Sequence, residues 1–519
     1  MAKRDLIGYG WIMKEYDLRS SIRKFQDFDK HYLVESQADL KREQRSENAF
    51  ERYKPVWSKA LRDVYDGYTI VNHLMYAIKN ESFDIHLIKR VFESLDRKEQ
   101  KQFFSLVKSQ LRNEDVRRAA YLYEVLLQEE IPIKADALKK VSYAELFDCS
   151  KYYTSSRKDR LDAKFRINDN SLGHLQIFSP VLSRYQNPIK SGFELGKRYR
   201  QVCDAYPQEV KSECARWLAY SETRSSLGIE NIDANSGVVN RHIELLELLD
   251  KTGEDKGYSR EQIDNITRGL PELTEELLAW LQREMSDREE KYEYGFREGQ
   301  NFIATNLPGG GVVLNHLCPP PGALGELMEV MDDIYKDVTS AQSDVDPLAA
   351  AALVSGAFVM IHPFNDGNGR LSRYLFHSVL ARRNFTEKRL IFPVSEAINL
   401  FKEQYYSALG DIFSPILSQA KYTIDSDTHK IVSQTNNLDI YRYPDFSGFS
   451  DFMYKCVDYC TDKVIPEMFE VTQKQLLMRK STGGMGEKME DYFYKRHAAA
   501  AAPQAEHRAD DGMEEVKER

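Results

Sequence analysis

The chain of 519 residues lacks several features that mark whole classes of protein. No apolar run reaches about eighteen residues, the length that a helix needs to cross a bilayer. The N-terminus, Met1–Leu6, has no apolar segment of the kind that secretory signals carry. We therefore expect a cytoplasmic protein without a membrane segment.

Cysteine is scarce, and basic charge is not in excess. The six cysteines include no Cys-x-x-Cys pair, so we expect them to be reduced and mostly packed in the interior. Cys456 and Cys460 share one face of a predicted helix, but they lack the histidines that would make a zinc site convincing. The formal net charge of −9 argues against non-specific nucleic-acid binding as the main role.

Helical periodicity dominates the sequence, so we expect a mainly α-helical protein. A chain of this length is too long for one ordinary core, which predicts two or three domains. The expected helices include residues 18–34, 57–80, 97–112, 238–250, 259–267, 271–297 and 323–337.

The most informative stretch is His362–Arg373, which reads His-Pro-Phe-Asn-Asp-Gly-Asn-Gly-Arg-Leu-Ser-Arg. Residues 348–361 before it are apolar on every face, which predicts a buried helix. Residues 370–383 carry apolar side chains at helical spacing. The run is therefore expected to form a loop between two helices, at the N-terminus of the second.

Such a loop is suited to binding a polyphosphate. The first N–H groups of a helix lack intrahelical partners, and the helix dipole is positive there. Gly367 and Gly369 can adopt positive φ, so that successive N–H groups point inward around an anion. Arg370 and Arg373 lie three residues apart and can act on the same phosphates.

Two further side chains of the run can supply chemistry. Asp366 offers hard oxygen ligands, which suit Mg²⁺ held between a carboxylate and substrate phosphates. His362 can take up a proton near neutral pH. Each residue alone is more often a turn or a packed side chain, but their joint occurrence indicates transfer of part of a nucleotide to a hydroxyl group.

The run resembles the signature of the Fic family, His-Pro-Phe-x-Asp/Glu-Gly-Asn-Gly-Arg-x-x-Arg, at every specified position. The resemblance implies a helical Fic fold with a short β-hairpin flap, and transfer of AMP from ATP to a Ser, Thr or Tyr hydroxyl of a target protein. It implies His362 as the general base and Asp366 as the Mg²⁺ ligand. The nucleotide- and phosphate-binding residues that it implies are Phe364 (also a structural anchor), Asn365, Gly367, Asn368, Gly369, Arg370 and Arg373.

A second segment, Ser226-Leu-Gly-Ile-Glu230-Asn231, resembles the inhibitory motif Ser/Thr-x-x-x-Glu-Gly/Asn that many Fic proteins carry. The resemblance implies that Glu230 pairs with Arg373 and prevents ATP from seating its γ-phosphate productively. The physical basis is simple, because a carboxylate on a cationic phosphate site competes with the substrate. We therefore expect Ser226 and Glu230 to hold the site in an inhibited state.

Residues 300–318 match the place of the family's flap, with a turn signal at Gly309–Gly311. The flap docks a target segment by strand addition, which implicates Val312, Val313 and Leu314. The expected division of the chain is an N-terminal, mostly helical accessory region (1–110), a helical pre-core region with the inhibitory helix (111–235), the Fic catalytic domain (236–425), a C-terminal helical region (426–480) and a disordered tail (481–519).

Three activities remain open on these residues. The first is an AMP transferase restrained by Glu230, and the second is a hydrolase that removes AMP and uses Glu230 to position water. The third is a kinase of the Doc type, which has a lysine where this chain has Gly369, so that Gly369 favours AMP transfer. The expected partners are ATP and a protein with a modifiable hydroxyl, with a homo-oligomer left open and neither nucleic acid nor membrane expected.

Overall fold

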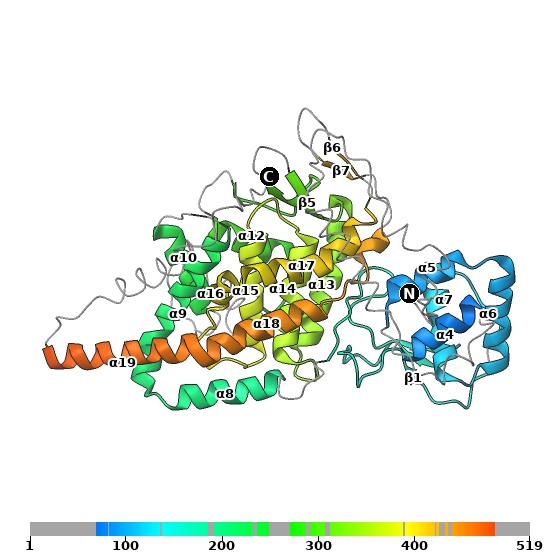
Figure 1. Ribbon diagram of the computed structural model, residues 1–519, viewed down its shortest axis with the longest axis horizontal. Coiled ribbons are helices and arrows are strands. Elements are labelled where there is room, and N and C mark those ends of the chain that lie inside the picture. Colours follow the sequence, from blue (N-terminus) through cyan, green and yellow to red (C-terminus); the bar gives the residue numbers. More distant parts are fainter. Residues whose placement is uncertain are drawn as a thin grey trace, which may run out of the picture. The chain divides into compact units, whose positions relative to one another are not determined.

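The protein is described by a computed structural model that is mainly α-helical, as the periodicity predicts (Figure 1). Among the residues that it describes, no helix is long and apolar enough to cross a membrane. All six cysteines are reduced, and all but Cys149 are buried. The described residues are 69–80, 83–134, 137–184, 191–230, 232, 236–248, 270–286, 291–306, 312–387, 390–420, 422–424, 431–433 and 438–482.

The chain forms two compact units, which we describe separately. Unit 1 contains the residues up to Val181 together with Ser414–Pro444, and unit 2 contains Leu182–Phe413 and the residues from Asp445 onward. The helices expected at 18–34 and 259–267 lie outside the described residues. Of the tail expected at 481–519, residues 481 and 482 are helical, and the rest lies outside the described residues.

This division differs from the expected domain boundaries. Residues 111–181 belong to the N-terminal unit rather than to a region before the catalytic core, and Ser414–Pro444 joins them. Backbone hydrogen bonds explain the second difference, because the N–H groups of Ser179 and Val181 donate to carbonyl groups at Arg442 and Pro444. Such long-range pairing leaves no local signal in the sequence.

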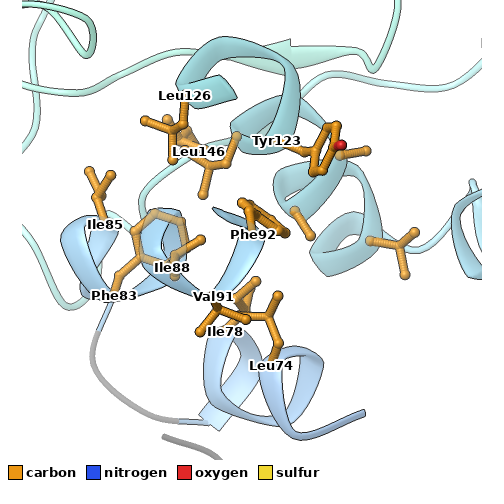
Figure 2. Packing of buried hydrophobic residues seen from close by; sticks show 14 of the residues in the cluster. Leu74, Ile78, Phe83, Ile85, Ile88, Val91, Phe92, Tyr123, Leu126 and Leu146 are labelled. Carbon is orange, nitrogen blue, oxygen red and sulfur yellow. The ribbon is translucent and has the colours of Figure 1, made fainter. Parts of the chain in front are cut away.

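The core of unit 1 is a four-helix cluster against a small sheet. Figure 2 shows apolar side chains of different helices converging there, including Leu74, Ile88, Phe92 and Tyr123. The helices are α4 (Ile70–Asn80), α5 (Ile85–Ser94), α6 (Arg97–Gln110) and α7 (Glu114–Leu127). The strands β1 (Ala144–Glu145), β3 (Ile167–Asn168) and β2 (Leu161–Asp162) form a sheet in that order, and β6 (Tyr422–Ile424) pairs with β7 (Ile431–Ser433).

Cap residues in the sequence set where these helices begin. Asp96 and Glu99 form a complete capping box at the start of α6, and Asn113 caps α7. The helix expected at 57–80 begins at Ile70 in the described part, and the one expected at 97–112 ends at Gln110.

Unit 2 is built around a helix that is buried along its whole length, α14 (Pro347–Ile361). Asp346 caps it by accepting N–H groups of the first turn, and Pro347 occupies a position where no N–H is needed. Gly356 allows α18 (Ser447–Tyr459) to come close, because a Cβ there would lie 2.9 Å from the Phe446 ring. Within unit 2, α13 (Leu324–Thr339) and α15 (Asn368–Arg382) also pack on α14 (Figure 1).

The remaining elements of unit 2 surround this centre. They are α8 (Gly192–Asp204), α9 (Gln208–Ile229), α10 (Ser236–Leu248), α12 (Glu275–Glu284), the hairpin β4 (Phe302–Asn306) and β5 (Val312–Leu317), the 3-10 turn Pro321–Ala323, α16 (Val394–Leu400) and α19 (Ile465–Thr482). A π-helical turn, Cys460–Val464, joins α18 to α19, and α17 (Lys402–Leu417) runs from unit 2 into unit 1.

The helix expected at 271–297 is shorter than its periodicity predicts, because α12 covers only Glu275–Glu284. Arginines from elsewhere take the carbonyl groups at its end. Arg370 donates to the Met285 carbonyl at 2.5 Å, and Arg241 donates to those of Glu284 and Ser286. These tertiary bonds satisfy carbonyl groups that a longer helix would have used internally.

Candidate active site

His362 ends α14 in the left-handed conformation, with φ 54° and ψ 59°, which is uncommon for a residue other than glycine. Its Nδ1 lies 3.1 Å from the Val359 carbonyl oxygen. Since a carbonyl group only accepts, Nδ1 carries the proton and Nε2 holds the lone pair. Burial lowers the pKa of His362 to about 4, so the imidazole is neutral at pH 7.

The loop after His362 is held by its own side chains. Asn368 accepts the Phe364 N–H at 3.0 Å and donates to the Phe364 carbonyl at 2.8 Å. Phe364 is fully buried and packs edge-on against Phe296, with 5.7 Å between ring centroids. Both side chains thus shape the loop. Because the amide of Asn368 is already bonded to the Phe364 backbone, the predicted phosphate contact of Asn368 would have to come from its backbone N–H.

Helix α15 begins without a side-chain cap. Gly367 occupies the cap position with φ 83°, in the left-handed region that favours glycine. The first N–H groups of such a helix end seek partners from outside the helix, and an anion is a suitable one. Gly367 therefore has the predicted conformation. Gly369 does not, because it lies in the first turn of α15 and its φ is not positive.

Glu230 lies at the C-terminal end of α9 and bridges both arginines of the loop. Its Oε1 lies 2.6 Å from Nη2 of Arg373, and its Oε2 lies 2.8 Å from Nε of Arg370. The predicted contact with Arg373 is present, and the contact with Arg370 extends it. Ser226 adds two acceptors for Arg373, its hydroxyl at 2.7 Å and its carbonyl at 3.0 Å. Asn231 lies outside the described residues.

Gly369 is required for this arrangement. A Cβ at that position would lie 2.5 Å from Oε1 of Glu230 and 3.1 Å from Nη1 of Arg373. A larger residue could not coexist with Glu230 in its present place. The glycine therefore makes room for the carboxylate as well as for any phosphate.

A buried polar network anchors the end of α9. Glu222 accepts the N–H of Ser395 at 2.8 Å and its hydroxyl at 2.6 Å, and it lies 3.1 Å from Nε2 of His377 on α15. Asn399 donates to the carbonyl of Ser225 at 3.0 Å. These bonds fix the turn from which Glu230 extends.

His242 on α10 is a buried neighbour of the two arginines. Burial, and to a smaller extent the charges of Arg370 and Arg373, lower its pKa to about 3. A neutral imidazole therefore adds no positive charge to a site that already holds two guanidinium groups.

Asp366 faces cations on two sides. Its Oδ2 lies 2.6 Å from Nζ of Lys291, and its Oδ1 lies 3.4 Å from Nη2 of Arg370 and accepts the Gly367 N–H at 2.8 Å. The predicted metal-ligating carboxylate is thus placed beside the phosphate nest.

The segment 291–301 supplies residues that no sequence pattern singles out. Arg297 is buried and donates to the carbonyl groups of His362, Gly299 and Pro319 at 2.8, 2.7 and 2.6 Å. It thereby joins the catalytic loop to both ends of the flap. Asn301 adds contacts to the carbonyl groups of Phe364 and Asn365, at 3.2 and 3.3 Å.

Gln282 and Glu293 hold the other side of the loop. Gln282 donates to the carbonyl groups of Lys291 and Asp366, at 2.7 and 3.3 Å, and accepts the Glu293 N–H at 3.0 Å. Glu293 accepts the N–H and the side-chain amide of the exposed Asn365, at 3.3 and 3.2 Å. Burial raises the pKa of Glu293. This role was missed at the sequence level because residues 271–297 were predicted to form one continuous helix.

The hairpin β4–β5 is antiparallel, with a bulge between Ile303 and Ala304. Of the residues predicted to dock a target, Leu314 is buried and Val313 is half-buried, so the Leu314 side chain packs inward. The side chain of Val312 and the glycines of the turn lie outside the described residues. His316, which the sequence did not mark, lies 2.7 Å from the Met360 carbonyl and stacks on Phe413.

Residues 272–380 match the model of the Fic/DOC family. Protein adenylyltransferase fic-1 of Caenorhabditis briggsae is 30% identical over 104 residues, 20% of each chain. Protein adenylyltransferase Fic of Drosophila sechellia is 38% identical over 120 residues, 22% of each chain. The chain thus spans about a fifth of the length of these relatives.

A solved structure with a similar arrangement is that of a Fic domain containing signaling protein from Bacteroides thetaiotaomicron. It is 17% identical, with a TM-score of 0.37, over 54% of this chain and 96% of that chain. The matched stretch 272–380 contains the flap and the loop, and it leaves Ser226 and Glu230 outside.

Proposed function

We propose that this chain, whose residues 272–380 are a Fic/DOC-family domain, is a protein adenylyltransferase restrained by its own Glu230. The observation that carries the proposal is a neutral, buried His362 at the end of α14, one short loop away from two buried arginines at the start of α15. Relatives that share this stretch are named protein adenylyltransferases, which supports transfer of AMP. The proposed substrates are ATP and a protein with a reactive hydroxyl.

In the proposed reaction the hydroxyl oxygen of the target forms a bond to the α-phosphorus of ATP. The bond from that phosphorus to the oxygen that bridges to the β-phosphate breaks, and pyrophosphate leaves. Nε2 of His362 takes the hydroxyl proton. Its lone pair is available because Val359 fixes the proton on Nδ1 and burial keeps the ring neutral.

The phosphates of ATP are proposed to bind at the start of α15, between Arg370 and Arg373. Glu230 now occupies both guanidinium groups, one with each carboxylate oxygen. ATP and Glu230 therefore compete for the same charge-assisted hydrogen bonds. This competition is the proposed basis of inhibition.

Asp366 is the residue that would hold Mg²⁺ together with the phosphates. It fits this role because it presents hard oxygens beside the nest and already faces the Lys291 ammonium group, a cation, at 2.6 Å. A bound Mg²⁺ would neutralise charge on the phosphates. Gln282 and the Gly367 N–H hold Asp366 in place for it.

Labelled ATP tests the proposal directly. With Mg²⁺ and cell lysate, we expect weak incorporation of label from the α-phosphate by the native chain and at least about tenfold more by Glu230→Gly. That ratio corresponds to about 1.4 kcal/mol of relieved competition. His362→Ala should abolish incorporation in both backgrounds, because the hydroxyl proton then has no acceptor. Mass spectrometry of the products should find AMP on Ser, Thr or Tyr.

Glu298→Gly is the matched control, since it makes the same chemical change at an exposed side chain of the same unit. It should leave incorporation at the native level. Unchanged incorporation in Glu230→Gly would remove the inhibitory assignment and leave AMP transfer standing. Label arriving from the γ-phosphate would instead identify a kinase, and loss of AMP from a modified protein that depends on Glu230 would identify a hydrolase.

A further inference from the structure

We propose that Lys291 is a second restraint on the site, which occupies the carboxylate of Asp366 in place of a divalent cation. The inference rests on the proposed function, because it assigns Asp366 to the metal that accompanies ATP. It differs from the restraint by Glu230, because it acts on the cation rather than on the phosphates. Lys291 thus sets how much Mg²⁺ the site requires.

The contact between Lys291 and Asp366 is built by the fold. Gln282, itself buried, donates to the carbonyl group of Lys291 at 2.7 Å and to that of Asp366 at 3.3 Å. The side-chain amide of Gln282 therefore bonds to the backbone of both Lys291 and Asp366. Its oxygen also accepts the Glu293 N–H. The Lys291 ammonium group then reaches Oδ2 of Asp366 at 2.6 Å.

The two cations cannot use this oxygen together. An ammonium group at 2.6 Å fills the place in which a hard cation would bind, and like charges at such separations repel. The other oxygen of Asp366 already accepts the Gly367 N–H at 2.8 Å. A divalent cation that binds Oδ2 of Asp366 must therefore displace Lys291 first.

Displacement is feasible because Lys291 is not enclosed. Its side chain is 39% exposed, so the ammonium group can return to water without leaving a buried charge. Arg370, by contrast, is buried and tied to Met285 and Glu230. Lys291 is therefore the cation around Asp366 that can move, and its removal should have a modest effect.

The test measures nucleotide binding as a function of Mg²⁺, in the full chain with Glu230→Gly so that the phosphate site is open. A non-hydrolysable ATP analogue is titrated by calorimetry at a series of Mg²⁺ concentrations. With Lys291→Met, nucleotide binding should be half-maximal at a Mg²⁺ concentration about three- to fivefold lower than in the parent. That factor corresponds to the contribution of an exposed ion pair. Lys291→Arg keeps the charge and should stay within about twofold of its parent.

Lys336→Met is the matched control, because Lys336 is an exposed lysine of the same unit that pairs with Asp332 and Glu272. It should leave the Mg²⁺ requirement unchanged. An unchanged requirement in Lys291→Met, with binding otherwise normal, would overturn this inference alone. A higher requirement would also overturn it and would make Lys291 a ligand of the phosphates. Absence of nucleotide binding in every variant would overturn the proposed function as well.

Discussion

Two carboxylates flank the same loop, and each faces cations, but their surroundings differ. Glu230 lies between guanidinium groups whose side chains are 1% and 4% exposed, whereas Asp366 meets a lysine side chain that is 39% exposed. Removing one partner of a buried pair costs about 3–5 kcal/mol, whereas an exposed pair contributes about 1 kcal/mol or less. We infer a strong restraint on the phosphate side and a weak one on the metal side.

The largest effect should come from Glu230→Gly, which leaves two buried arginines without their carboxylate. We expect a loss of about 3–5 kcal/mol in the free energy of unfolding of unit 2, measured by thermal or denaturant unfolding. ATP with Mg²⁺ should restore much of that loss, since phosphates replace the carboxylate. An equal stabilisation of the native chain and the variant by ATP would contradict competition at this site.

Gly369→Ala should also disturb the contacts of Glu230 with the arginines, because the added methyl group crowds the carboxylate. The new Cβ would lie 2.5 Å from Oε1 of Glu230, so the carboxylate must move, at a cost of up to about 3 kcal/mol of stability. In the Glu230→Gly background the same substitution should cost much less. Unfolding of the two single variants and the double variant measures this coupling, and additive costs would show that the crowding lies elsewhere.

Low pH should destabilise the folded chain by protonating His242, the buried neighbour of Arg370 and Arg373. Its pKa is about 3 in the folded chain and about 6.5 in an unfolded one, so the folded state binds the proton less readily. Stability is then fully present above about pH 6.5 and is lost as the pH falls toward 3. The free energy of unfolding should fall between pH 8 and pH 5, and His242→Gln should make this fall about 2 kcal/mol smaller. If the variant has the same pH profile of stability as the native chain, His242 does not contribute.

The smallest effect should come from Lys291→Met on stability. We expect a change below about 1 kcal/mol, because the pair is exposed and its partner keeps contacts to Arg370 and Gly367. Raising the salt from about 0.1 to 1 M should shrink even this difference, because the screening length falls from about 10 to 3 Å. If Lys291→Met lowered the free energy of unfolding as much as Glu230→Gly does, the contacts of Glu230 and of Asp366 would not differ in strength.

The parts of the site that could be predicted from sequence are those carried by continuous segments. The apolar run predicts α14, and the glycines predict the turn into α15. In both cases the residues that make the structure are close together in the chain, so local patterns sufficed. The contact of Glu230 with Arg373 joins residues far apart in the chain, and only the resemblance to the family's inhibitory motif implied it.

The parts that could not be predicted depend on side chains that act across long sequence distances. Arg297, Gln282 and Lys291 lie in or near a stretch that reads as helix, yet their bonds go to residues 362 to 366. Where that stretch stops being helical, arginines from α10 and α15 donate to its carbonyl groups. Neither the early end of α12 nor the partners of these side chains can be seen in a window of neighbouring residues.

The missing side chain at Gly369 also constrains how this sequence can evolve. Any larger residue there would collide with Glu230, so the two positions cannot change independently. A bulkier residue at 369 would have to move the Glu230 carboxylate from its present contacts with the arginines. The proposed restraint and the size of residue 369 are therefore linked.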